Sequence, residues 1–189
     1  MVTCSPPAAR QPRQQTPLAD LEIQVCPFVT AIDTREQAPW AFQGVVIGKR
    51  HLVIPREVKT LKTGDYSIEG MESSVIIERK EVSDFLGSIT AGNARFRREH
   101  ERMAAIVHAG GSACVIVEGC LSAICDELDS PDSDRQIRSD TVIGITATWP
   151  MRYDVPWYFA WDRRRAELLG FRVMWKWWWD REQTHGGQE

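Results

Sequence analysis

GDYSIEGMESSVIIERKEVSD, residues 64–84, is the stretch that decides the fold we expect for this chain. Within it, three β-branched residues at 75–77 run directly into Glu78, Arg79 and Lys80. A run that is apolar on both faces is typical of a strand buried in the middle of a sheet. Because side chains alternate along a strand, Glu78 and Lys80 share one face and Arg79 lies on the other. The sequence therefore predicts a carboxylate beside an ammonium at the end of a buried strand.

A second carboxylate, Asp65, follows Gly64 in the preceding strand or turn. Two carboxylates from adjacent strands, with a lysine two residues beyond one of them, are suited to hold Mg²⁺ and to position a water for attack on a phosphate. The competing interpretation is an ordinary strand that ends in solvated charges. Further acids favour a site: Asp84 lies four residues past Lys80, where we expect a helix to begin, and residues 33–36 form another charged cluster after another apolar strand.

These residues resemble the signature of the XPF/Mus-type structure-specific DNA endonucleases: G-D-Y, then E-R-K, then three residues and an aspartate. IDTRE at 32–36 is similar to that family's earlier V-D-x-R-E element, and residues 83–89 and 95–103 resemble its next two helices. The resemblance extends over roughly residues 28–180. It implies a restriction-endonuclease-like, or PD-(D/E)XK, fold: an α/β sandwich in which a central mixed β-sheet is flanked by helices.

The resemblance also implies a magnesium-dependent DNA endonuclease of DNA repair or recombination, which hydrolyses phosphodiester bonds in branched, flapped or fork-like DNA. The residues to which it gives a catalytic role are Asp33, Arg35, Glu36, Asp65, Glu78, Arg79, Lys80 and Asp84.

Asp65 and Glu78 are the main ligands that we expect for Mg²⁺ or Mn²⁺, because a hard divalent cation takes carboxylate, water and phosphate oxygens. Asp33 and Glu36 complete this site or hold a second ion. Lys80 orients or deprotonates the attacking water, or stabilises the developing charge as a fixed cation.

Two of the motif residues have a structural alternative. On a regular strand Arg79 points away from Glu78, so a salt bridge to Glu81 or Asp84 is as consistent with the pattern as a phosphate contact. Ser83 or Asp84 is placed to cap the helix that we expect to follow. Local physics alone does not separate these roles.

Arg95, Arg98 and Arg102 form a basic stripe along a helix expected over residues 94–108. We hypothesise that this stripe contacts DNA phosphates, because such contacts supply affinity that does not depend on sequence. The alternative is a solvated helix face that Glu99 and Glu101 partly neutralise.

Tryptophan is concentrated near the C-terminus, and a single helix cannot bury Trp177, Trp178 and Trp179 on one face. Members of the resembled family pair their nuclease domains, so we expect a homodimer or heterodimer through this Trp-rich helix. Simple core packing with one exposed ring is the alternative.

The expected domain organisation is a flexible Pro-rich tail at 1–24, a nuclease domain at 25–180 and a flexible tail at 181–189. Strands are expected at 27–32, 53–61, 65–68, 75–80, 113–117 and 156–160, of which the three consecutive strands at 53–61, 65–68 and 75–80 suggest an antiparallel meander. Helices are expected at 84–89, 94–108, 141–149 and 163–179. Residues 126–134 hold five acids and a proline, which predicts an exposed loop.

The overall composition restricts the class of protein only weakly. The net charge of −3 over 189 residues excludes a polycation, so any DNA-binding surface must be local. Five cysteines without zinc-ligand spacing indicate reduced thiols. No apolar run approaches a membrane span, so we expect a cytoplasmic protein, associated with the nucleoid in a prokaryote or phage or located in the nucleus of a eukaryote.

Two other functions remain open at this point. The first is a catalytically inactive DNA-binding partner in a nuclease dimer, although the retained acids argue against degeneration. The second is a resolvase or restriction-like nuclease that acts on other DNA. Many relatives carry a tandem helix-hairpin-helix domain after the nuclease, and no such segment follows residue 180 in this sequence, which leaves the preference for branched DNA open.

Overall fold

The computed structural model describes residues 21–185, and its centre is a six-stranded mixed sheet with the strand order β5-β2-β6-β7-β8-β9. β2 pairs with β6, and β6 with β7, in antiparallel fashion, whereas the pairs β2–β5, β7–β8 and β8–β9 are parallel. The strands are β2 (Thr30–Asp33), β5 (Arg56–Lys59), β6 (Tyr66–Ile68), β7 (Val75–Lys80), β8 (Ser112–Val117) and β9 (Trp157–Phe159). The predicted mixed sheet is confirmed.

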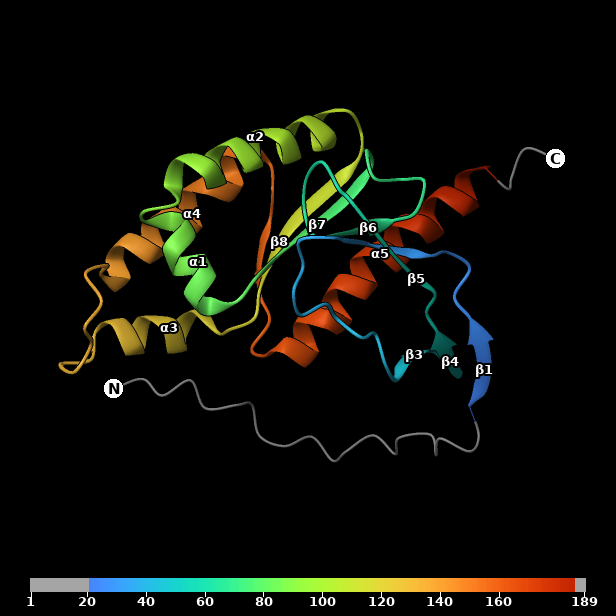
Figure 1. The fold of residues 1–189 in the computed structure, drawn as a ribbon, viewed down its shortest axis with the longest axis horizontal. Coiled ribbons are helices and arrows are strands. Elements are labelled where there is room, and N and C mark those ends of the chain that lie inside the picture. The colour runs from blue at the N-terminus through green and yellow to red at the C-terminus, as the bar shows by residue number, and fades with distance from the viewer. Residues whose placement is uncertain (1–20, 186–189) are drawn as a thin grey trace.

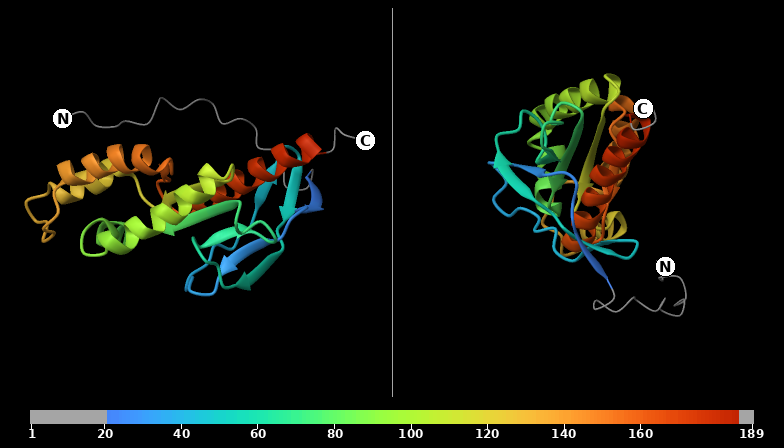
Figure 2. Two further views of the ribbon diagram at one scale, coloured as in Figure 1. Left: turned by 90° about the horizontal axis from the view of Figure 1, so that it is seen from above. Right: turned by 90° about the vertical axis from the view of Figure 1, so that its right-hand side faces the viewer.

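Helices cover both faces of this sheet, which makes an α/β/α sandwich (Figures 1 and 2). One core packs the sheet against α5, and the other packs it against the remaining four helices. The helices are α1 (Val82–Ile89), α2 (Asn93–His108), α3 (Leu121–Leu128), α4 (Ser139–Tyr153) and α5 (Arg163–His185). Within the described range, none of them combines the length and the apolar character needed to cross a lipid bilayer.

The alternation of side chains along β7 decides which charge faces which helix. Val75 and Ile77 lie in the core beneath α5, and Ile76 lies in the core beneath α1 and α2. Continuing the same alternation, Arg79 falls on the α5 side, whereas Glu78 and Lys80 fall on the α2 side. The separation predicted from the sequence is therefore built into the sheet.

A smaller sheet, with the order β1-β4-β3, lies at the end of the molecule away from α3 and α4 (Figure 1). Its strands are β1 (Glu22–Val25), β3 (Val45–Ile47) and β4 (Arg50–Val53). Val45 and Leu52 are buried and join the core beneath α5. β1 begins inside the segment predicted to be a tail at 1–24, so the folded part starts earlier than predicted. Residues 1–20 of that segment lie outside the described residues.

One prediction about connectivity was wrong, and the exposed loop predicted at 126–134 begins later than predicted, at residue 129. The antiparallel meander is interrupted, because β2 inserts between β5 and β6 and pairs with both. α3 occupies residues that we assigned in part to an exposed acidic loop. Its Ile124 and Leu128 are buried, and this tertiary packing outweighs the local acidity in the pattern.

Two helix ends also differ from prediction. α1 begins at Val82, and Glu81 occupies its N-cap position without a capping hydrogen bond from the side chain. Ser83 and Asp84 lie inside the helix, so neither of them is the capping residue. α5 continues to His185, into the segment predicted as a flexible tail at 181–189. Residues 186–189 lie outside the described residues.

Gly64 fixes the approach of β6 to β7 and so places Asp65. Its φ is +72°, and a Cβ on it would lie 2.3 Å from Cγ2 of Ile76 and 3.0 Å from the carbonyl oxygen of Ile77. An alanine at position 64 would have to adopt a left-handed backbone conformation, and its Cβ would clash with Ile76. We expect Gly64→Ala to lower the free energy of unfolding by about 2 to 4 kcal/mol in urea titrations. The equivalent change at Gly48, which also has a positive φ but open space around it, should cost less; equal losses at the two positions would refute the packing argument.

Candidate active site

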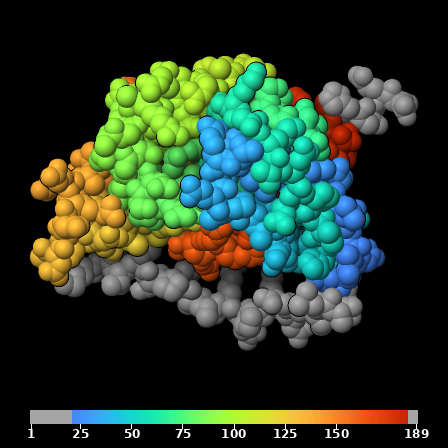
Figure 3. Space-filling model, in the orientation of Figure 1, coloured from blue at the N-terminus to red at the C-terminus, as the bar shows by residue number. Residues whose placement is uncertain are grey.

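Asp65 and Glu78 line one cavity of about 430 Å³, together with Glu36, Lys80 and Asp84. Asp65 reaches it from the position just before β6, and Glu78 reaches it from near the end of the neighbouring β7. Figure 3 shows this face, where the green surface of α1 and α2 meets the blue surface of the loop after β2. The sequence prediction that these acids converge beside a lysine is met by the geometry.

Hydrogen bonds hold each carboxylate by one oxygen. Oδ2 of Asp65 accepts a 2.7 Å hydrogen bond from the backbone N–H of Arg79, and Oε1 of Glu78 is paired with the ammonium of Lys80. Within residues 21–185, Oδ1 of Asp65 and Oε2 of Glu78 accept no hydrogen bond, and neither is enclosed away from the cavity. Each carboxylate thus presents one uncommitted oxygen to the cavity.

The pKa values of Asp65 and Glu78 indicate that the negative charge in this cavity exceeds the positive charge around it. Burial, opposed by the Arg79 N–H and Lys80, raises the pKa of Asp65 to about 6. The pKa of Glu78 is raised well above its usual value by burial and then by the charge of Asp65. Lys80 behaves in the opposite way: burial opposes its ammonium form, but Glu78 and then Asp65 outweigh burial and raise the pKa of Lys80. A divalent cation is the kind of ligand that would relieve this excess of negative charge.

The raised pKa of Asp65 predicts a pH-dependent stability. A carboxyl whose pKa is higher in the folded state contributes stability that is complete below its unfolded pKa of about 4 and is lost as the pH rises through about 6. We therefore expect Asp65→Asn to raise the free energy of unfolding of metal-free protein by about 2 kcal/mol at pH 8, with almost no change at pH 4. Thermal melts across this range in EDTA measure the difference. A variant that gains nothing at pH 8 would contradict the assigned environment.

Asp33 is committed to the backbone around the site. Its Oδ1 accepts hydrogen bonds from N and Nε of Arg35, and its Oδ2 accepts from Nη2 of Arg35 and from the N–H of Leu61. The side chain is fully buried, and Asp33 is not among the residues that line the cavity. This geometry favours an anchoring role for Asp33; ligation of a metal by Asp33 stays a prediction that the contacts do not support. Arg35, which Asp33 holds, does line the cavity.

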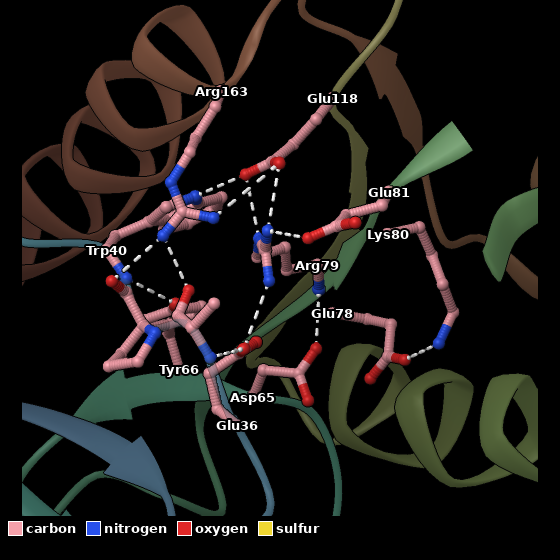
Figure 4. Close-up of polar contacts among 12 residues, drawn as sticks. Glu36, Trp40, Asp65, Tyr66, Glu78, Arg79, Lys80, Glu81, Glu118 and Arg163 are labelled. Carbon is pink, nitrogen blue, oxygen red and sulfur yellow. Dashed lines mark hydrogen bonds and ion pairs between the residues drawn. The ribbon is translucent and has the colours of Figure 1, made fainter. Parts of the chain in front are cut away.

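Arg79 is the centre of a buried ionic network on the α5 side of the sheet (Figure 4). Nε and Nη2 of Arg79 donate to the two oxygens of Glu118 at 2.7 and 2.9 Å, Nη1 donates to Glu36 at 3.0 Å, and Nη2 also donates to Glu81 at 2.6 Å. Its side chain is 6% exposed. Of the two alternatives for Arg79, the contacts support the salt bridge, and the predicted partner Glu81 is present but Asp84 is not.

Glu118 completes this network, although no motif in the sequence indicated a role for it. Glu118 follows β8 on the same side as Cys114 and Ile116, and its Oε1 also accepts a 2.7 Å hydrogen bond from Nε1 of Trp40. Burial opposes its ionised form, but the hydrogen bonds from Arg79 and Trp40 hold the pKa of Glu118 below the usual value. The available signal was the charge directly after a buried strand, as for Glu78.

Glu99 is a second acid whose position the sequence did not reveal. It lies on α2, its side chain is only 14% exposed, and it lines the same cavity as Asp65 and Glu78. The alternative interpretation of the arginine stripe places Glu99 on a solvated helix face. Its charge instead contributes to the raised pKa values of Asp65, Glu78 and Lys80.

The predicted arginine stripe is divided among different surroundings. Arg95 lines the site cavity and an adjoining cavity of about 420 Å³. Arg98 is exposed and lines neither of them. Arg102 lines a separate cavity and donates from Nε to Oγ1 of Thr63 at 3.1 Å. Asp84, in the first turn of α1, is exposed and lines both site cavities.

The chemistry of the donor set fits one octahedral divalent cation. Among residues 21–185, no group of three or more His, Cys, Asp or Glu side chains is arranged to enclose an ion unaided. Mg²⁺ does not require such a cage, because it keeps several waters and binds through one or two carboxylates plus substrate phosphates. Asp65 and Glu78, each with one uncommitted oxygen, are two carboxylates that this cavity offers to such an ion.

Comparison with known proteins places this arrangement in context. The model of the ERCC4 domain matches residues 32–166. A solved structure titled XPF from Aeropyrum pernix has a TM-score of 0.55 and 21% identity, over 78% of this chain and 60% of that one. A second, titled as the same protein in complex with DNA, has a TM-score of 0.54 and 20% identity, over 86% of this chain and 68% of that one. No curated protein sequence matches. The structural similarity confirms the restriction-endonuclease-like fold predicted from the sequence.

Proposed function

Because the chain belongs to the ERCC4 domain family, we propose that it is a metal-dependent endonuclease that hydrolyses phosphodiester bonds in branched, flapped or fork-like DNA. The observation that carries this proposal is the meeting of Asp65, Glu78 and Lys80 in one cavity, with one free oxygen on each carboxylate. A related fold has been solved with DNA bound, which supports DNA as the substrate class.

We infer that Asp65 and Glu78 hold Mg²⁺ or Mn²⁺, with Glu36 close enough to influence the charge of Asp65. When bound, the metal ion would lower the pKa of its coordinated water and neutralise charge on the phosphodiester. Oε1 of Glu36 accepts hydrogen bonds from Arg79 and from the N–H of Ala38, so Oε2 is the oxygen that remains for a metal ion.

Lys80 acts, in this proposal, as a fixed cation. Its raised pKa keeps the amine protonated at neutral pH, so it donates hydrogen bonds and does not take a proton from water. Held by Glu78, the ammonium is directed at the place where negative charge develops on the phosphate, and a preorganised cation there stabilises the transition state. Arg35 and Arg95, at the rim of the same cavity, are placed to hold neighbouring phosphates.

A substrate panel tests the proposal. End-labelled flap, fork, four-way junction and plain duplex DNA would be incubated with the protein in Mg²⁺, in Mn²⁺ and in EDTA. We expect metal-dependent cuts in the branched substrates. Binding without cleavage would indicate the inactive DNA-binding partner, and equal cleavage of plain duplex would indicate a restriction-like or resolvase activity.

We also propose that α5 contributes to a dimer. Phe171 and Met174 are buried beneath the sheet, but Trp179 is 43% exposed and stacks on Trp175 at a ring-centroid distance of 6.3 Å. An exposed ring that continues an aromatic cluster is suited to pack against a partner. Because Trp178 itself packs against the core, Trp179 is the better position to change.

We expect Trp179→Ala to weaken self-association by at least about 10-fold without loss of thermal stability, since one interface aromatic is commonly worth more than 1 kcal/mol. Sedimentation velocity over a range of concentrations measures this. Trp161→Ala, which removes a ring that is 69% exposed outside α5, is the control. A parent protein that stays monomeric, or identical association of the parent and Trp179→Ala, would contradict the proposed interface.

A further inference from the structure

We propose that Lys62, Thr63 and Arg102 form a second phosphate-binding subsite, which holds the DNA backbone a few nucleotides from the cut. This inference rests on the proposed nuclease function and names a part of its substrate surface. It replaces the continuous arginine stripe predicted along α2 by a site built from α2 and the segment before Asp65.

The subsite is a cavity of about 490 Å³ between residues 59–63 and α2. Three cations, Lys59, Lys62 and Arg102, line it, against one acid, Glu72. Lys59 is paired with Glu72 at 2.8 Å, and Arg102 lies at the 4.0 Å limit of an ion pair with Glu99. Among the described residues, Lys62 forms no salt bridge and Arg102 forms only this long one, so both cations can bind an external anion. In a chain with a net charge of −3, a local excess of positive charge beside an acidic site is a specific feature of the surface.

The guanidinium of Arg102 is held with its donor edge open. Its Nε donates to Oγ1 of Thr63, which is buried, and this contact fixes the plane of the group. Nη2 lies 4.0 Å from Glu99, at the limit of an ion pair, and the side chain is 49% exposed. The terminal N–H groups of a guanidinium fixed in this way are suited to two parallel hydrogen bonds to a phosphate. Thr60 also lines the cavity, and threonine hydroxyl groups commonly donate hydrogen bonds to the phosphate oxygens of the DNA backbone.

The subsite is joined directly to the active site. Leu61, in its wall, donates its N–H to Asp33 and accepts from Arg35 through its carbonyl oxygen. Thr63 precedes Asp65 by two residues, so their Cα atoms lie within about 7 Å. Phosphates along one B-DNA strand advance about 3.4 Å along the helix axis per nucleotide. We therefore expect a phosphate bound at Arg102 to belong to a nucleotide close to the one that is cut.

Binding measured without divalent metal tests the subsite. Affinity for a flap substrate would be measured in EDTA at several salt concentrations, for the parent, Lys62→Ala, Arg102→Gln and the control Arg152→Gln. Arg152 is exposed on α4 and has no place in this cavity. We expect the slope of log K against log salt to fall by about 1 for each variant and to be unchanged for the control. Since Lys62 is exposed, Lys62→Ala tests the idea even if Arg102→Gln loosens the contact with Thr63.

Neutral methylphosphonates, placed one at a time along the strand, locate the contact. In the parent we expect weakened binding when one particular phosphate close to the cut is neutralised, and in Arg102→Gln we expect that penalty to vanish. Identical penalties in parent and variant, or unchanged salt slopes, would overturn the inference. A parent that neither binds nor cuts DNA would overturn the nuclease proposal itself, so the two failures are distinguishable.

Discussion

Replacing Glu78 with glutamine is expected to slow DNA cleavage in Mg²⁺ by at least about 100-fold while the protein stays folded. Glutamine keeps the shape of the side chain but removes the charge that, with Asp65, draws the cation into the cavity. It also releases the ammonium of Lys80 from the ion pair that holds it. A single electrostatic group aimed at the reacting phosphate typically accelerates the reaction by about two or three powers of ten. Glu78 both attracts the cation and holds Lys80, so its loss should lower the cleavage rate by at least that much.

The measurement is single-turnover cleavage of the best substrate from the panel, with binding followed in parallel. Asp162→Asn is the matched control, because this carboxylate forms a surface pair with Arg165 away from the cavity. We expect the control to cleave as the parent does. A folded Glu78→Gln protein that cleaves at the parental rate would remove Glu78 from the mechanism.

The second large effect concerns stability. Arg79→Met should lower the free energy of unfolding by about 3 to 5 kcal/mol, because it leaves Glu36 and Glu118 buried without their shared cation. The methionine fills much of the volume of the lost side chain, so the loss reports on charge more than on packing. Cleavage should fall as well, because the loop that carries Glu36 loses its contact with β7.

Chemical denaturation of Arg79→Met beside Arg165→Met measures this effect. Arg165 pairs with Asp162 at the surface, where its side chain is 63% exposed, and such a pair is worth under about 1 kcal/mol. Similar small losses for the two variants would show that the network around Arg79 contributes little to the fold.

The fold and the centre of the site were predictable because β7 carries both kinds of information. Its apolar residues 75–77 show burial on both faces, and alternation then assigns Glu78 and Lys80 to one side and Arg79 to the other. The mixed sheet, the fold class and the convergence of Asp65 with Glu78 follow from this stretch and from the family resemblance.

The remaining features depend on contacts between distant segments. Glu118 meets Arg79 only because β8 lies parallel to β7, and Glu99 faces the cavity only because α2 crosses above it. Likewise, Asp33 looked like a ligand, but Arg35 and Leu61 occupy its oxygens. α3 was not predicted because its two buried apolar residues, Ile124 and Leu128, lie close to acidic residues, and the local acidic pattern indicated a loop.

Anomalous diffraction from crystals grown with Mn²⁺ and a cleavage-blocked DNA substrate is the most direct test of the central claim. The proposed mechanism predicts a manganese peak within bonding distance of Asp65 and Glu78, with a DNA phosphate beside it and Lys80 as the nearest protein cation. A peak held by other side chains, in a protein that cleaves DNA under the same conditions, would contradict it.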